Sequence, residues 1–190
     1  MLASRSPQRR AILANLGLAF EVVESSFDEV EVGGDPEALA LANARGKSRS
    51  VAAQGHLLVL GADTVVAVDG VSVGSPADGD GAAAMLAQLS GRTHEVMTAL
   101  LILADGEESS ALVRSEVTFR TLSAEIVGWY VATGEWRGRA GGYAIQGAGA
   151  ALATHIHGDL SNIIGLPVGA LLDLLAPIGI APWRNLTVQG

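Results

Sequence analysis

The sequence predicts an α/β (mixed α+β) protein, built as one twisted mixed sheet with flanking helices. Helix-like and strand-like segments alternate along the chain without a repeat of fixed period. Hydrophobic residues make up 49% of the 190 residues, which is enough for a packed core. The 24 glycines are scattered among apolar runs, so they mark turns and not a low-complexity tract. We therefore expect a single domain over residues 1–190.

Helix starts are marked by capping residues. Proline follows a capping side chain at Ser6-Pro7 and at Asp35-Pro36, an arrangement that begins a helix. Ser123 caps a later start, and glycines mark helix ends. The predicted helices cover residues 7–16, 36–53, 80–89, 123–134 and 167–175.

Strands are predicted where apolar and β-branched residues alternate or run together. Asp69-Gly70 and Asp105-Gly106 are tight turns between such runs. Residues 57–68 form a nearly continuous apolar run, which is typical of a strand covered on both faces. The predicted strands cover residues 20–24, 57–68, 94–104, 112–119 and, with glycine kinks, 143–156.

Composition excludes several classes of protein. The chain has no cysteine, which excludes disulfides, zinc-thiolate sites and cysteine nucleophiles. Twelve Lys and Arg against twenty Asp and Glu give a net charge of -8, so we expect no nucleic-acid partner. The apolar runs are shorter than the roughly 20 residues of a membrane span, and Met1–Arg10 lack the apolar core of a secretory signal. We expect a cytoplasmic protein that makes no contact with membranes.

Asp63 is an isolated carboxylate inside the apolar run 57–68. Burying an unpaired charge costs several kcal/mol, so Asp63 requires a cation, either a divalent metal or a lysine or arginine. We expect it at a strand end that opens on a cleft, where it would hold Mg²⁺ and orient a water. The alternative is that Asp63 only caps the turn after residue 62. Asp28-Glu29 is either an exposed turn or the source of a second carboxylate for the same metal.

A candidate anion site lies at the first helix start. Ser4–Arg10 combine hydroxyls, three arginines and free helix N–H groups. Helix capping explains Ser6 and Pro7 but not the arginines in so acidic a chain. Together with Asp63, this segment indicates a phosphate ligand joined by a metal to carboxylates, as in a metal-assisted phosphoanhydride hydrolase.

Three other motifs are weaker. Gly46-Lys47-Ser48 has the ending of a P-loop, but Leu41 stands where that motif needs glycine. Gly147-Ala148-Gly149 lacks the third glycine of a dinucleotide-binding turn. His155 and His157 would share one face of a strand, either as a metal pair or, as we favour, as solvent-exposed histidines.

Five motifs, in order and across almost the whole chain, resemble the Maf family of nucleoside triphosphate pyrophosphatases. The motifs are Leu2-Ala3-Ser4-Arg5-Ser6-Pro7-Gln8-Arg9, Val59-Leu60-Gly61-Ala62-Asp63-Thr64-Val65-Val66, Leu89-Ser90-Gly91-Arg92-Thr93-His94, Ala140-Gly141-Gly142-Tyr143-Ala144-Ile145-Gln146-Gly147 and Ser161-Asn162-Ile163-Ile164-Gly165-Leu166-Pro167. The resemblance implies a fold similar to inosine triphosphatase, with two lobes around a cleft, and a homodimer. It also implies a house-cleaning enzyme that releases a monophosphate and pyrophosphate with Mg²⁺ or Mn²⁺.

The resemblance also implies roles for individual residues. Ser4 and Arg9 would hold phosphates at the first helix, and Lys47 would reach them from the second. Glu29 and Asp63 would bind metal or activate water, with Asp63 as the catalytic residue.

Base selection is implied in the same way. Gln146 would contact the base, and the Gly-Ala-Asp-Thr and Ile-Gln-Gly sequences resemble the subgroup that acts on dTTP and UTP. A pyrimidine triphosphate, modified forms included, is the expected substrate.

The sequence departs from the family pattern at three places. Ser75 stands before Pro76 where the family usually has lysine, Gly138-Arg139 replace a usual Asp-Lys, and Gln8 stands where arginine is common. Ser75 favours an alternative, a catalytically weak nucleotide-binding regulator of cell division or septum formation. The retained Asp63, Arg9, Lys47 and Gln146 oppose it.

Overall fold

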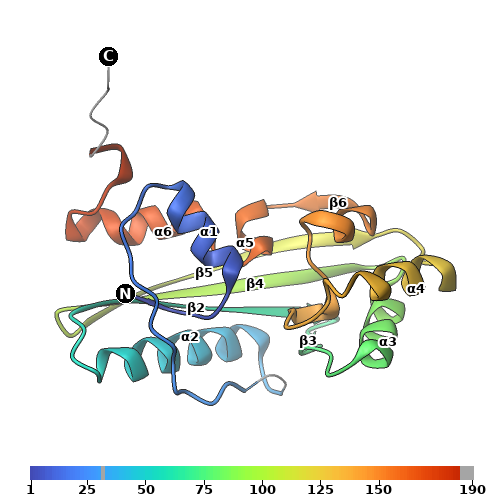
Figure 1. The fold of residues 1–190 in the computed structure, drawn as a ribbon, viewed down its shortest axis with the longest axis horizontal. Helices are drawn as coiled ribbons and strands as arrows, with labels where there is room; N and C mark the ends of the chain where they lie inside the picture. The colour runs from blue at the N-terminus through green and yellow to red at the C-terminus, as the bar shows by residue number, and fades with distance from the viewer. Residues whose placement is uncertain (31–32, 185–190) are drawn as a thin grey trace.

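A mixed six-stranded sheet organises the molecule. The computed structural model describes residues 1–30 and 33–184 (Figure 1). The strands are β1 (Leu2–Ala3), β2 (Leu58–Val68), β3 (Val71–Ser72), β4 (Thr93–Ala104), β5 (Glu107–Phe119) and β6 (Ala153–His157). Their order is β1-β2-β4-β5-β6, with β3 paired to β2, and the β1–β2 pair is parallel while the others are antiparallel. The predicted mixed sheet with flanking helices is confirmed.

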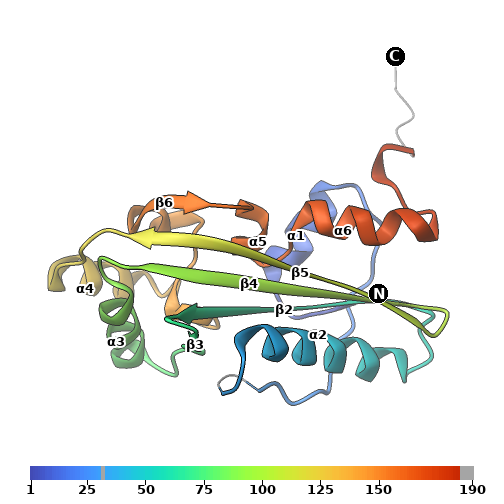
Figure 2. The ribbon, with the colours of Figure 1, turned by 180° about the vertical axis from the view of Figure 1, so that it is seen from behind.

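Helices cover both faces of this sheet. The α-helices are α1 (Pro7–Asn15), α2 (Pro36–Ala52), α3 (Gly79–Leu89), α4 (Ala124–Thr133), α5 (Leu160–Ile164) and α6 (Val168–Leu175). Four short 3-10 helices are η1 (Ala140–Gly142), η2 (Gly147–Ala151), η3 (Ala176–Ile178) and η4 (Pro182–Arg184). Figures 1 and 2 show α2 along one face, α1 and α6 on the opposite face, and α3 and α4 at the far end of the long strands. Among the described residues, no helix is long and apolar enough to span a membrane.

The predicted helix starts are confirmed by their caps. The side chains of Ser6, Asp35 and Ser123 accept hydrogen bonds from backbone N–H groups of the first turns of α1, α2 and α4. Such caps are local, so they are visible in the sequence. Helix α5 was not predicted, because its five residues are too few to show a period.

Three strand predictions are wrong. Residues 20–24 form no strand, and only Val22 makes an isolated bridge, to Leu2. Residues 143–156 are mostly loop and the 3-10 helix η2, with β6 beginning only at Ala153, because Gly147 adopts a left-handed φ of 74°. Strand β5 begins at Glu107 instead of residue 112, because its polar start is paired with β4.

Strand β2 places adjacent side chains on opposite faces of the sheet. Val59 and Val65 belong to the core under α2, whereas Ala62 belongs to the core under α1 and α6. Asp63 therefore faces α2, and Thr64 faces α1. We expected Asp63 at a strand end, but it lies in the middle of β2.

Gly61 brings α2 unusually close to β2. A Cβ at Gly61 would lie 2.1 Å from Ser48 Oγ and 2.4 Å from the Ala44 carbonyl oxygen, so only glycine permits this contact. Gly61 lies two residues before Asp63 on the same face of the strand. The close approach brings the α2 side chains within reach of Asp63.

Candidate active site

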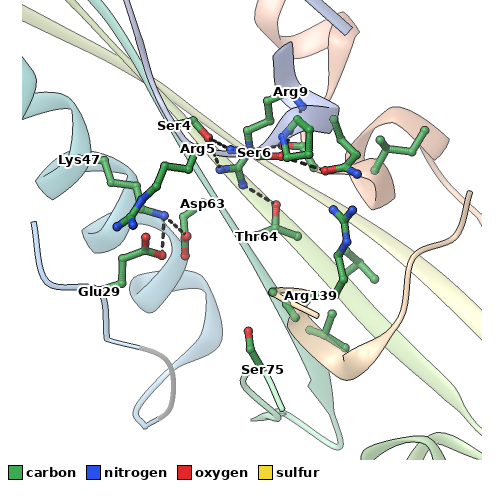
Figure 3. Close-up of a pocket in the computed structure, with 18 of the residues that line it drawn as sticks. Ser4, Arg5, Ser6, Arg9, Glu29, Lys47, Asp63, Thr64, Ser75 and Arg139 are labelled. Carbon is green, nitrogen blue, oxygen red and sulfur yellow. Dashed lines mark hydrogen bonds and ion pairs between the residues drawn. The ribbon is translucent and has the colours of Figure 1, made fainter. Parts of the chain in front are cut away.

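A polar cleft of about 430 Å³ lies over the middle of β2 (Figure 3). Its lining includes the segment that enters α1 together with the first turn of that helix, Glu29, Lys47 of α2, Ser75, and the segments 137–140 and 163–165. Of the predicted site residues, the structure brings five to this cleft: Ser4, Arg9, Glu29, Lys47 and Asp63. Gln146 is not among the residues that line it.

Two carboxylates converge on one ammonium group at the α2 side of the cleft. Lys47 Nζ lies 2.6 Å from Asp63 Oδ1 and 2.6 Å from Glu29 Oε2. Lys47 and Asp63 are buried, while the side chain of Glu29 is 47% exposed. Lys47 is thus a cation that the buried Asp63 requires, and among the described residues its third N–H is left for another acceptor. This arrangement brings Glu29 close to Asp63 through Lys47, while a metal shared by the two carboxylates stays a prediction.

Asn43 ties the Glu29 segment to Asp63, which sequence reasoning missed. Its Nδ2 donates to Asp63 Oδ2 at 3.0 Å and to the Val30 carbonyl oxygen at 2.7 Å, and its Oδ1 accepts from the Val30 N–H at 3.1 Å. Asn43 is 3% exposed. Both oxygens of Asp63 are therefore held, one by Lys47 and one by Asn43. An asparagine within an Ala-rich helix gives no signal of these long-range contacts in the sequence.

Arg9 is a buried link between the layers of the fold. Its guanidinium donates to the carbonyl oxygens of Gly165 at 2.8 Å and Ala62 at 2.9 Å, to Thr64 Oγ1 at 3.0 Å and to Ser4 Oγ at 3.3 Å. Burial lowers the pKa of Arg9, and the negative charges of Asp63 and Glu29 oppose this shift. Contacts within the described part of the chain engage four of the five donors of Arg9, which leaves one N–H for a phosphate.

The start of α1 supplies hydrogen-bond donors to the cleft, and the first turn of this helix contains no acidic residue. Ser6 caps the helix by accepting from the Arg9 N–H, and its own N–H donates to Ser4 Oγ at 3.1 Å. Arg5 is exposed and lines the cleft. The helix N-terminus and this arginine together favour a bound anion.

Arg139 provides a further cation on another wall of the cleft. Figure 3 shows it across the cleft from Lys47 and Glu29, with Ser75 on a further segment of the wall. The Nε atom of Arg139 is buried and has no hydrogen-bond partner among the described residues. Arg137, two residues earlier, also lines the cleft, whereas Arg92 pairs with Asp69 and does not line it.

A second cavity of about 300 Å³ adjoins the cleft. The two cavities share the lining residues Gln8, Arg139, Ile163 and Ile164. Gln146 is exposed and lines this second cavity. The predicted phosphate residues and the predicted base residue therefore lie in adjoining spaces.

The cleft wall is supported by a buried aromatic pair. Tyr143 lines the cleft, and its hydroxyl lies 2.8 Å from Nε2 of His94, which is 1% exposed. Burial lowers the pKa of His94 from its ordinary 6.5 to about 4. Burial also raises the pKa of Tyr143.

This histidine should make folding stability depend on pH. Because the pKa of His94 is lower in the folded state, the unfolded chain binds more protons between about pH 6.5 and pH 4. The contribution of neutral His94 to the free energy of unfolding is therefore complete above pH 6.5. About 3 kcal/mol of it is lost as the pH falls toward 4. Urea unfolding of the wild type and of His94→Gln from pH 7 to 4.5 measures this loss of stability. Parallel pH profiles for the two proteins would contradict the assignment to His94.

The carboxylates fit a divalent metal only in part. The described residues contain no group of three or more His, Cys, Asp or Glu side chains that could hold a metal. Mg²⁺ is usually bound by one or two carboxylates together with substrate phosphates, and Asp63 with Glu29 match that pattern. His155 and His157 are exposed on β6, in agreement with the favoured prediction.

Comparison with known proteins gives consistent results over nearly the whole chain. A family model described as "Maf-like protein" matches residues 1–178. A dTTP/UTP pyrophosphatase of Deinococcus radiodurans is 44% identical over 95% of this chain and 93% of the relative. The dTTP/UTP pyrophosphatases of Moorella thermoacetica (44% identical; 98% of each chain) and Myxococcus xanthus (43% identical; 97% of this chain and 95% of the relative) are similar to the same extent.

Proposed function

Because the chain belongs to the Maf family, we propose that it hydrolyses dTTP or UTP to the nucleoside monophosphate and pyrophosphate. The observation that carries the proposal is the single cleft in which Asp63, Lys47 and Glu29 lie opposite further cations. Relatives 43–44% identical to this chain bear the name of that activity. Phosphoryl chemistry depends mainly on positioning and charge neutralisation, and this cleft offers both.

In the proposed reaction, a water oxygen attacks the α-phosphorus of the triphosphate. The bond from this phosphorus to the oxygen that bridges to the β-phosphorus breaks, and pyrophosphate leaves with the electron pair. Asp63 accepts the proton of the attacking water, and each of its oxygens keeps a lone pair for this besides its bond to Lys47 or Asn43. Lys47, Arg5 and Arg139 bind the phosphate oxygens.

A divalent metal, Mg²⁺ or Mn²⁺, would be held by Glu29 and Asp63. When bound, it supplies positive charge that neutralises the triphosphate. Lys47 Nζ contacts both of these carboxylates, and its ammonium would also bind phosphate oxygens.

The finer parts of the proposal concern substrate and setting. We propose that Gln146 contacts the base in the second cavity and that modified pyrimidine triphosphates are also accepted. We also propose a cytoplasmic homodimer. The resemblance of the five motifs supports these points, and size-exclusion chromatography with light scattering tests the dimer.

Product analysis tests the reaction. The protein is incubated with each common nucleoside triphosphate and Mg²⁺ or Mn²⁺, and products are separated by ion-exchange chromatography. We expect monophosphate and pyrophosphate, formed fastest from dTTP or UTP. A nucleoside diphosphate with orthophosphate, or no turnover of any triphosphate, would contradict the proposal. Tight binding without turnover would favour the alternative, a catalytically weak nucleotide-binding regulator.

A further inference from the structure

Glu135 follows α4 and lines the second cavity beside Gln146. We propose that Glu135 is a positioning residue for base selection, which acts by fixing the loop that carries Gln146. This inference rests on the proposed function, because it assigns the second cavity to the base of a pyrimidine nucleotide.

The carboxylate of Glu135 holds two backbone groups of that loop. Its Oε1 accepts from the Ala148 N–H at 3.0 Å, and its Oε2 accepts from the Gly149 N–H at 3.2 Å. These N–H groups lie in η2, directly after Gln146. Hydrogen bonds to an ionised acceptor are stronger than neutral ones, so this carboxylate is an effective anchor.

The loop is fitted closely around this anchor. Gly147 has a φ of 74°, and a Cβ there would lie 2.6 Å from Glu135 Oε1. A Cβ at Gly149 would lie 1.9 Å from the Ala144 carbonyl oxygen. At the other end of the loop, the Ala144 N–H donates to the Tyr130 hydroxyl at 2.9 Å. Gln146 is therefore exposed to the cavity between two fixed points.

A fixed loop can distinguish pyrimidines by hydrogen bonding. Uracil and thymine present an N3–H donor beside the O4 acceptor, whereas cytosine presents an N3 acceptor beside an amino donor. Polar groups held in one arrangement satisfy one pattern and leave unpaired groups against the other. A loosened loop can rearrange to suit both bases, so discrimination should fall when the anchor is removed.

The test compares UTP with CTP in Glu135→Ala, in the conservative Glu135→Gln and in a control, Glu125→Ala. Glu125 is exposed in the first turn of α4 and lines neither cavity. We expect Glu135→Ala to lower the ratio of kcat/KM for UTP over CTP by about tenfold, mainly through a higher KM for UTP. Glu135→Gln should lie between the wild type and Glu135→Ala, because its amide oxygen can still accept, and Glu125→Ala should match the wild type.

Amide hydrogen exchange gives a second readout. The Ala148 and Gly149 amides should exchange faster in Glu135→Ala and at the wild-type rate in Glu125→Ala. Faster exchange with an unchanged ratio of kcat/KM for UTP over CTP would overturn the inference. An equal loss of kcat for both nucleotides would also overturn it, as would a wild type that does not discriminate between them. A wild type that turns over no triphosphate would instead refute the proposed function.

Discussion

Replacing Asp63 by asparagine is expected to lower the rate of hydrolysis per folded molecule by about 100-fold or more. Asparagine keeps the shape of the side chain but removes the charge that, in the proposed reaction, binds metal and accepts a proton. In the structure, Asp63 also accepts from two donors, Lys47 and Asn43. An amide has one acceptor oxygen, so one of these donors would then face the NH₂ group of the variant.

The same change should therefore lower stability as well, by about 1–3 kcal/mol for the donor left without an acceptor. Lys47 would still be paired with Glu29, so we expect the variant to fold. Urea unfolding gives the stability, and single-turnover kinetics at saturating metal give the rate of the folded fraction.

A matched control is Asp35→Asn at the N-cap of α2, outside the cleft. Asparagine caps helices as well as aspartate does, so this variant removes one negative charge without either expected effect. If Asp63→Asn loses stability but keeps a normal rate per folded molecule, Asp63 has a purely structural role.

Introducing lysine at Ser75 is expected to raise kcat/KM, by up to about 10- to 100-fold. Ser75 lines the cleft at a position where the family usually carries lysine. A hydrogen bond from a charged donor contributes about 1.5–3 kcal/mol, and the full gain appears only if it acts in the transition state. The control Ser75→Gln adds length and donors without the charge, and should show little gain.

An arginine that already lines the cleft, such as Arg137 or Arg139, could limit this gain. Arg139 lines the same cleft, whereas Arg92 is paired with Asp69 outside it. Suppose that Ser75→Lys does not raise kcat/KM, that Arg139→Gln alone lowers it, and that adding Ser75→Lys to Arg139→Gln restores it. Arg139 would then already supply the positive charge in the wild type. That result would contradict the prediction of a missing cation.

Local signals account for what the sequence predicted well. Capping residues such as Ser6 and Asp35 act within one turn, so the helix starts were predictable. The segment 20–24 has strand-like composition, but β1 beside it has only two residues, so no ladder can form. Propensity contains no information about whether a partner strand exists.

The site was predictable as a set of charges but not as a set of contacts. An aspartate in an apolar run demanded a cation, but the sequence did not reveal that Lys47 and Asn43 provide the contacts. Arg9 was predicted to bind phosphate, and the structure shows most of its donors committed to the protein itself. Such partners lie far apart in the sequence and are fixed only by the fold.

The opposite orientation of Asp63 and Thr64 has a consequence for engineering this protein. One residue inserted into or deleted from β2 ahead of Asp63 would exchange the two faces, and would turn the carboxylate toward Arg9 and the hydroxyl toward Lys47. Strand β2 should therefore not tolerate a change in length ahead of Asp63. The Asp105-Gly106 turn between β4 and β5 lines neither cavity, and a tag or reporter peptide belongs there.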